Sequence, residues 1–169
     1  MKYMLFAGIL FMSVRAAAQT PEEKLAAKGI RLSEVSKPVA NYVNVVRTGN
    51  LLFLAGKGPL VNGEYIKGKL GKDLTIEQGY KAAEITAIDQ LSVLKAELGD
   101  LSKVKRIVKV NGYVNSESDF YDQPAVINGF SDMRVYVFGE KGKHARTSLG
   151  VNTLPSNIAV EIELIVEVE

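Results

Sequence analysis

NIAVEIELIVEVE, residues 157–169, ends the chain with the strict alternation of a β-strand that is buried on one face. Val160 and the alternate apolar residues through Val168 share one side, whereas the glutamates that begin at Glu161 share the other. Ile165 interrupts the glutamate side. We therefore expect a core-facing side, and an opposite side that is either solvated or closed by other subunits around a polar centre.

Upstream of this strand, the sequence predicts helices that alternate with further strands. A capping box at Thr75 and Gln78 and a stop at Gly99 define the clearest helix. The other expected elements are a helix over 21–28, a hairpin within 42–58, a short strand around Tyr65, strands over 104–114 and 145–151, and a helix from Ser118 or Asp119 to about Phe138. Since strand–helix–strand units take right-handed crossovers, the simplest fold is α+β, a single mixed β-sheet with two helices packed on one face.

The N-terminal residues 1–18, MKYMLFAGILFMSVRAAA, have the pattern of a signal peptide. Lys2 precedes a short apolar core, and small residues end at Ala18, where we expect cleavage and a periplasmic or secreted product. An uncleaved interfacial anchor or a misassigned start codon, with a cytoplasmic protein, are the alternatives. An N-terminal helix and linker over 19–37 and one domain over 38–169 complete the expected organisation.

Charge and composition narrow the classes of partner. The chain has 21 basic and 19 acidic side chains, and the N-terminal segment holds Lys2 and Arg15, so 21 − 2 = 19 basic side chains remain against 19 acidic ones. A neutral domain lacks the basic footprint of a nucleic-acid-binding protein, so we do not expect nucleic acid as a partner. No stable membrane partner is expected either.

Few residues in the chain are suited to catalysis. The single histidine, His144, and the absence of cysteine disfavour a zinc or copper centre, and no G-x-S-x-G elbow is present for a serine nucleophile. Arginine with carboxylate remains: Arg146 enters a strand from a Gly/Lys loop, and a guanidinium binds a carboxylate through two parallel hydrogen bonds. His144 has no evident partner, and we expect it on the loop surface, at most at the rim of a cleft.

Three stretches resemble one known family. They are YVNVVRTGNLLFLAGKGPL (42–60), KVKRIVKVNGYVNSESDF (103–120) and ARTSLGVNTLPSNIAVEIELI (145–165). In this order they are similar to the first hairpin, the central strand and the C-terminal signature of the reactive-intermediate deaminase family, also called Rid, YjgF or endoribonuclease L-PSP. The resemblance covers roughly residues 38–168.

This resemblance implies a chorismate-mutase-like fold, a homotrimer, and sites in the clefts between subunits. It also implies a substrate, a small 2-imino or enamine acid, which water converts to a 2-oxo acid with release of ammonia. In the family the arginine corresponding to Arg146 binds the substrate carboxylate, and the glutamate corresponding to Glu161 positions water or relays protons. No cofactor or metal is implied.

The same comparison implies substrate contacts from five further positions. They are Tyr42, Gly56, Lys57, Asn128 and Ser148. Lys57 stands where glutamine is common, and Ser148 where some members have cysteine. Two other functions stay open: a non-catalytic trimer that binds a small carboxylate or a partner, and an endoribonuclease, against which the neutral charge argues.

Overall fold

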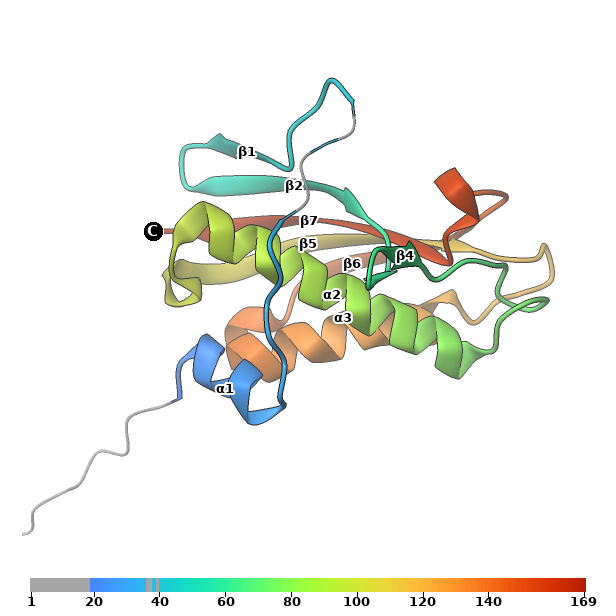
Figure 1. The fold of residues 1–169 in the computed structure, drawn as a ribbon, viewed down its shortest axis with the longest axis horizontal. Coiled ribbons are helices and arrows are strands. Elements are labelled where there is room, and N and C mark those ends of the chain that lie inside the picture. Colours follow the sequence, from blue (N-terminus) through green and yellow to red (C-terminus); the bar gives the residue numbers. More distant parts are fainter. Residues whose placement is uncertain (1–18, 36–37, 39) are drawn as a thin grey trace, which may run out of the picture.

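The computed structural model describes residues 19–35, 38 and 40–169, so the predicted signal peptide lies outside the described residues. A five-stranded sheet in the order β1-β2-β7-β5-β6 forms the scaffold, and β3 and β4 form a separate hairpin (Figure 1). The strands are β1 Val45–Thr48, β2 Leu51–Lys57, β3 Leu60–Val61, β4 Glu64–Tyr65, β5 Val104–Asn115, β6 Ala145–Val151 and β7 Val160–Val168. The helices are α1 Pro21–Ala27, α2 Ile76–Leu98 and α3 Gln123–Phe138, and short 3₁₀ turns lie at Leu101–Lys103, Gly139–Gly142 and Pro155–Asn157.

The C-terminal strand β7 lies in the middle of the sheet. It pairs antiparallel with β2 on one side and with β5 on the other, while β6 extends β5 in parallel. Its burial alternates residue by residue, as the sequence predicts: Val160 and every second residue after it are buried, and the glutamates are half-buried. The predicted single mixed sheet is confirmed.

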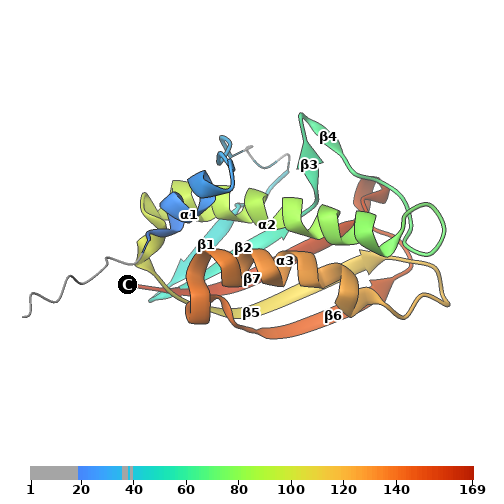
Figure 2. The ribbon, with the colours of Figure 1, turned by 90° about the horizontal axis from the view of Figure 1, so that it is seen from below.

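Helices α2 and α3 cover one face of this sheet (Figure 2). The Thr75 hydroxyl accepts a hydrogen bond from the Gln78 backbone, the Gln78 side chain accepts one from Thr75, and Gly99 ends α2 in the left-handed region. Apolar residues of α2 and α3 pack on the buried sides of β5 and β7 in one core. We call this side the helix face, and the opposite side the open face.

Helix α3 begins later than expected, so the predicted start at Ser118 or Asp119 is wrong. Residues 116–122 form a loop that is bonded to the rest of the fold, for instance by the Glu117 amide to the Leu70 carbonyl. Pro124 lies in the first turn of the helix, where its missing N–H costs nothing. The Ser116 and Glu117 amides are therefore used in tertiary contacts rather than in a helix.

Helix α1 packs against α3. Lys24 Nζ donates to the Val137 carbonyl, the Tyr136 hydroxyl donates to the Lys24 carbonyl, and Leu25 joins the core. The chain then crosses α2, where the Ser33 amide donates to Ser92 Oγ, on its way to β1 (Figure 1). This segment adds a layer outside the helices.

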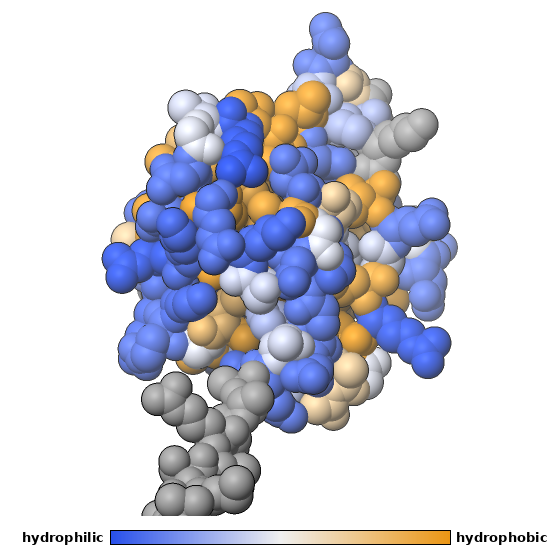
Figure 3. Space-filling view, turned by 90° about the vertical axis from the view of Figure 1, so that its left-hand side faces the viewer, coloured by the Kyte–Doolittle hydropathy of each residue, from blue (hydrophilic) through white to orange (hydrophobic). Residues whose placement is uncertain are grey.

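The end of the molecule that carries the C-terminus is mostly hydrophilic, with hydrophobic residues visible between the polar ones (Figure 3). Arg47 in β1 donates to the Glu169 carbonyl, and Asn50 donates to Glu167, which joins the β1–β2 turn to the end of β7. Across the described residues, no helix is both long and apolar enough to cross a membrane.

Candidate functional site

Arg146 lies on the edge strand β6 and faces α3. It pairs in register with buried Val110 of β5, which places its side chain on the helix face. Its Nη1 donates to Asn128 Oδ1 at 2.8 Å and to Ser131 Oγ at 3.0 Å. Because Asn128 and Ser131 are three residues apart on α3, they lie on one side of the helix and hold the guanidinium together.

The two bonds use both hydrogens of Nη1. Within the described part of the chain, Nε and Nη2 of Arg146 have no protein acceptor, so this edge of the guanidinium is available. Two parallel N–H groups on that edge match the two oxygens of a carboxylate. Ser148 follows on the same side of β6, and its hydroxyl oxygen is buried without a partner in the described chain. Arg146, Asn128 and Ser148 therefore form one polar cluster, the arginine cluster.

Glu161 and Gly56 meet on the open face. The β2–β7 register shifts between Leu54 and Lys57, and this bulge brings the Gly56 backbone against Glu161. A Cβ atom at Gly56 would lie 2.4 Å from Glu161 Oε1, so the carboxyl group occupies the space that any side chain at position 56 would take. The predicted backbone contact of Gly56 thus adjoins the predicted proton-relay residue.

The surroundings of Glu161 favour its protonated form. Burial raises the pKa of its carboxyl group above the usual value, and the neighbouring Glu163 charge raises it further. Glu163 is itself bound by Asn111 Nδ2 at 2.9 Å and by the Tyr113 hydroxyl at 3.3 Å. A half-buried carboxyl group with a raised pKa is a candidate for transferring protons.

Arg146 and Glu161 lie on opposite faces of the sheet. Strand β5 separates their strands, and Arg146 is in register with Val110 whereas Glu161 is in register with Tyr113. Two strand spacings and three residues along β5 put the two Cα atoms about 14 Å apart, with side chains directed away from each other. One copy of the chain therefore cannot bring both groups to one substrate.

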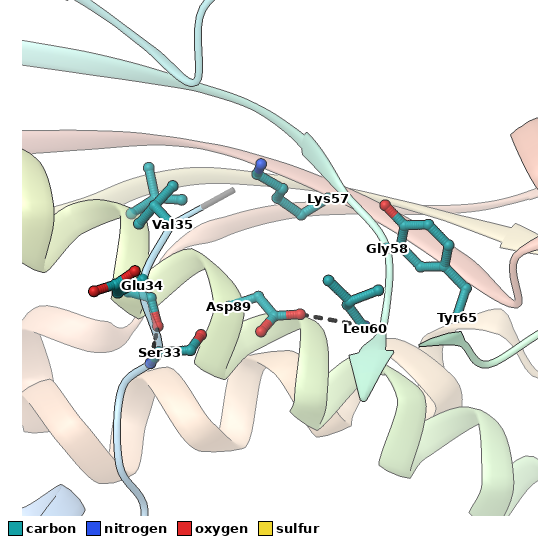
Figure 4. Close-up of a pocket in the computed structure, with 10 residues that line it drawn as sticks. Ser33, Glu34, Val35, Lys57, Gly58, Leu60, Tyr65 and Asp89 are labelled. Atoms are coloured by element: carbon teal, nitrogen blue, oxygen red, sulfur yellow. Dashed lines mark hydrogen bonds between the residues drawn. The ribbon is translucent and has the colours of Figure 1, made fainter. Parts of the chain in front are cut away.

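Lys57 lies apart from both groups, on the helix face. It pairs with buried Ile162, and its Nζ donates to Asn44 Oδ1 at 2.7 Å. Its side chain lines a small pocket of about 70 Å³ between α2, the start of β3 and residues 33–35 (Figure 4). Burial lowers the pKa of Lys57, and the Asp89 charge opposes that shift only in part.

The carboxyl group of Asp89, in the same pocket, lowers the stability of the folded protein when it is charged. Burial raises the pKa of its carboxyl group to about 6, although the Leu60 amide donates to it. A folded pKa above the unfolded value contributes stability below pH ~4 that is lost as the pH rises through ~6. Asp89→Asn keeps an acceptor for Leu60 and removes the charge. We expect it to increase the free energy of unfolding by about 1–2 kcal/mol at pH 8, after discounting for partial exposure.

Urea unfolding at pH 8 and pH 4 measures this difference, with Asp119→Asn at an exposed loop position as the control. The gain should nearly vanish at pH 4, where position 89 is neutral in the folded state of both proteins and the unfolded Asp89 is about half protonated. An equal gain at the two pH values would show that the charge of Asp89 is not the cause.

Tyr42 lies in the segment before β1, with 50% of its surface exposed, and among the described residues no hydrogen bond joins it to the other predicted site residues. His144, in contrast, is not on the loop surface, so that prediction is wrong. It is half-buried, and its ring nitrogens lie 2.7 Å from the Gly142 carbonyl and 3.1 Å from Ser131 Oγ. The turn Gly139–Gly142 folds back on α3 and brings the ring to this position.

Sequence reasoning missed Ser131, the second residue that binds Arg146 Nη1. Its spacing of three from Asn128 was a usable signal, since that spacing puts two residues on one helix face. Among the described residues, no group of three or more His, Asp or Glu side chains is placed to hold a metal ion.

The sheet order β1-β2-β7-β5-β6, with α2 and α3 on one face, is an α+β sandwich of the chorismate-mutase-like fold. Residues 22–168 match the family described as "YjgF/chorismate mutase-like, putative endoribonuclease". The chain belongs to the YjgF/RutC/Rid family. The match includes α1, in agreement with the packing of that helix on α3.

Relatives and solved structures agree with this assignment. Protein TCP17 of Trypanosoma cruzi is 43% identical over 141 residues, which are 82% of this chain and 88% of that protein. A RutC family protein of Pyrococcus abyssi is 27% identical over 143 residues, 83% of this chain and 97% of that one. A crystal structure of a protein of unknown function from Agrobacterium tumefaciens superposes with a TM-score of 0.83 at 40% identity, covering 88% of this chain and 92% of that one.

Proposed function

We propose that this protein hydrolyses small 2-imino and enamine acids to 2-oxo acids with release of ammonia. The observation that carries the proposal is the state of Arg146: both Nη1 hydrogens are bound by α3, and the Nε–Nη2 edge is left for a carboxylate. Such charge-assisted bonds contribute about 1.5–3 kcal/mol each to binding. Asn128 and Ser148 add polar groups beside the anchor.

The reaction needs orientation and proton transfer. Water adds to the imine carbon while the nitrogen takes up a proton, and the resulting tetrahedral adduct loses ammonia as its hydroxyl becomes the 2-oxo group. Glu161, with its raised pKa, donates the proton to nitrogen and accepts one from water. Arginine fixes the carboxylate next to the reacting carbon, which makes the addition effectively intramolecular.

A complete site on this scheme requires two copies of the chain. Because Arg146 and Glu161 lie on opposite faces, one copy supplies the arginine cluster and another supplies Glu161 with Gly56. The open face exposes large apolar residues suited to self-association, namely Val46, Phe53 and Leu149. We propose a homotrimer in which each open face meets the β6 edge of a neighbour.

Mixed assemblies test this arrangement. Arg146→Ala and Glu161→Gln each remove one half of the site, so each variant alone should release little ammonia from 2-aminoacrylate-derived imines. Co-expressed in equal amounts, they should regain about a quarter of wild-type activity, because a quarter of random neighbour pairs combine an intact arginine with an intact glutamate. No recovery in mixed trimers, verified by mass spectrometry, would contradict a shared site.

A binding module without turnover is the second candidate. The arginine cluster is complete within one chain and does not include Glu161, so carboxylate binding alone does not need the glutamate. Saturable binding of 2-oxobutanoate, lost in Arg146→Ala and accompanied by no ammonia release from any imine tested, would favour this function over hydrolysis.

A further inference from the structure

A chain of hydrogen bonds connects Arg146 to the backbone of the turn before β6. Arg146 Nη1 lies 3.0 Å from Ser131 Oγ, and Ser131 Oγ lies 3.1 Å from His144 Nε2. His144 Nδ1 in turn lies 2.7 Å from the Gly142 carbonyl oxygen. The chain thus joins three elements: strand β6, helix α3 and the turn Gly139–Gly142.

The chemistry of each group fixes the direction of every bond. A carbonyl oxygen only accepts, so His144 Nδ1 carries the hydrogen and donates it to Gly142. In the neutral ring Nε2 then accepts, and Ser131 must donate its hydroxyl hydrogen to it. The Ser131 lone pairs are left for Arg146, whose guanidinium only donates. No other assignment satisfies all three bonds with a neutral ring.

The structure favours the neutral ring. Burial lowers the pKa of His144 below its usual value and outweighs the hydrogen bond to the Gly142 carbonyl, which raises the pKa; the positive charges of Arg134 and Arg146 lower it further. Charged groups of β5 and of the turn also lie around the ring, namely Arg106, Glu140 and Lys143. At neutral pH the ring is therefore an acceptor toward Ser131.

The far end of the chain is fixed by backbone packing. Gly142 is buried, and a Cβ atom there would lie 2.2 Å from the Arg134 carbonyl oxygen of α3. The turn therefore lies directly on the helix, and its carbonyl holds the imidazole at a set position. The ring is a rigid reference for Ser131, which is otherwise free to rotate its hydroxyl.

We propose that His144 is a positioning residue: through Ser131 it fixes the Nη1 side of Arg146 and so directs the Nε–Nη2 edge at the substrate carboxylate. The inference rests on the proposed function for its effect on turnover, but the hydrogen-bond chain itself exists without substrate. It assigns a role to the sole histidine, which carries none in the scheme above, and it explains what orients the Ser131 hydroxyl. Neither residue contacts the reacting atoms.

Kinetics test the role. His144→Phe keeps the ring shape and removes both bonds, and we expect KM for an imino acid to rise about three- to tenfold, the effect of one lost hydrogen bond, with a smaller change in kcat. His144→Gln, whose amide oxygen can accept from Ser131, should stay close to wild type. Ser131→Ala should resemble His144→Phe, and the double variant should be no worse than either single one, because both break the same chain.

Equal KM values for wild type and His144→Phe, or effects of the two substitutions that multiply, would overturn the proposal. Lys143→Ala, a change at the adjacent exposed residue, is the matched control and should leave KM unchanged. Thermal unfolding of each variant shows whether it is folded, so that a folding defect is not mistaken for an effect on KM.

Nitrogen-15 NMR of the full-length protein, prepared without a histidine tag, tests the hydrogen-bond chain independently of activity. Its histidine signals are unambiguous, because His144 is the only histidine. We expect the Nδ1–H tautomer at pH 7.5, and a shift of the Nε2 resonance in Ser131→Ala. An Nε2–H tautomer, or no response to Ser131→Ala, would overturn the proposal even if the wild type proves to have no deaminase activity. If the spectra are as expected but the protein has no deaminase activity, the proposed reaction is contradicted and the hydrogen-bond chain is not.

Discussion

Replacing Arg146 with alanine should lower kcat/KM for a 2-imino acid about 100-fold, since it removes a charge-assisted pair of hydrogen bonds to the substrate carboxylate. The kcat/KM of Arg146→Lys should lie between those of the wild type and Arg146→Ala, because an ammonium keeps the charge but lacks the planar fork. Stability should change little, because the two acceptors that are freed, on Asn128 and Ser131, lie at a partly open edge. Coupled detection of ammonia or of the 2-oxo acid measures the rates.

Arg31→Ala is the matched control, because Arg31 is an exposed arginine outside the arginine cluster. It should leave kcat/KM unchanged. If Arg146→Ala and wild type hydrolysed the imine at the same rate, Arg146 would have no part in the reaction, and the opposite-face geometry would lose its functional meaning.

Gly129→Ala should lower the free energy of unfolding by about 3 kcal/mol or more. A Cβ atom at Gly129 would lie 2.0 Å from the Tyr80 carbonyl oxygen and 3.1 Å from the Glu84 amide nitrogen of α2. Because these are backbone atoms, the two helices must separate, and this cost exceeds the ~1 kcal/mol that alanine gains in helix propensity. Asn128, the residue before Gly129, would move with α3 and release Arg146 Nη1.

Gly79→Ala provides the matched control, because Gly79 is a buried glycine in the first turn of the other helix, α2. Its Cβ would lie 2.7 Å from Leu70 Cδ1 and 3.0 Å from a Val126 methyl, which are side-chain tips that can rotate. Urea unfolding should therefore show a much smaller loss than for Gly129→Ala. Similar losses for both variants would contradict the assignment of the cost to the helix–helix backbone contact.

The sequence predicted most of the fold because local signals and global structure agree in it. The alternation in 157–169 anticipated the burial of β7, and the capping box and terminal glycine anticipated the bounds of α2. The position of β7 between β2 and β5 was not accessible, because pairing between distant strands leaves no local pattern. The start of α3 was missed because the Ser116 and Glu117 amides bond to strands and loops that are distant in the sequence.

The sequence named candidate residues for the site, but it did not indicate how they are arranged. The resemblance pointed to Arg146 and Glu161 together, whereas the register puts them on opposite faces. The alternation along β7 shows which of its residues share a face, but it does not show on which face of the sheet a residue of β6 lies. His144 lacked a visible partner in the sequence, since its partner Ser131 reaches it only after the turn Gly139–Gly142 folds onto α3.

The central place of β7 makes the sheet depend on pairing between segments that are far apart in the sequence. Strands β2 and β5 do not pair with each other, because β7 lies between them. The pairs β1–β2 and β5–β6 become one sheet only when β7 has joined both, and pairing across such a sequence separation is slow to form during folding. A truncation of residues 160–169 therefore leaves two separate strand pairs rather than a shortened domain.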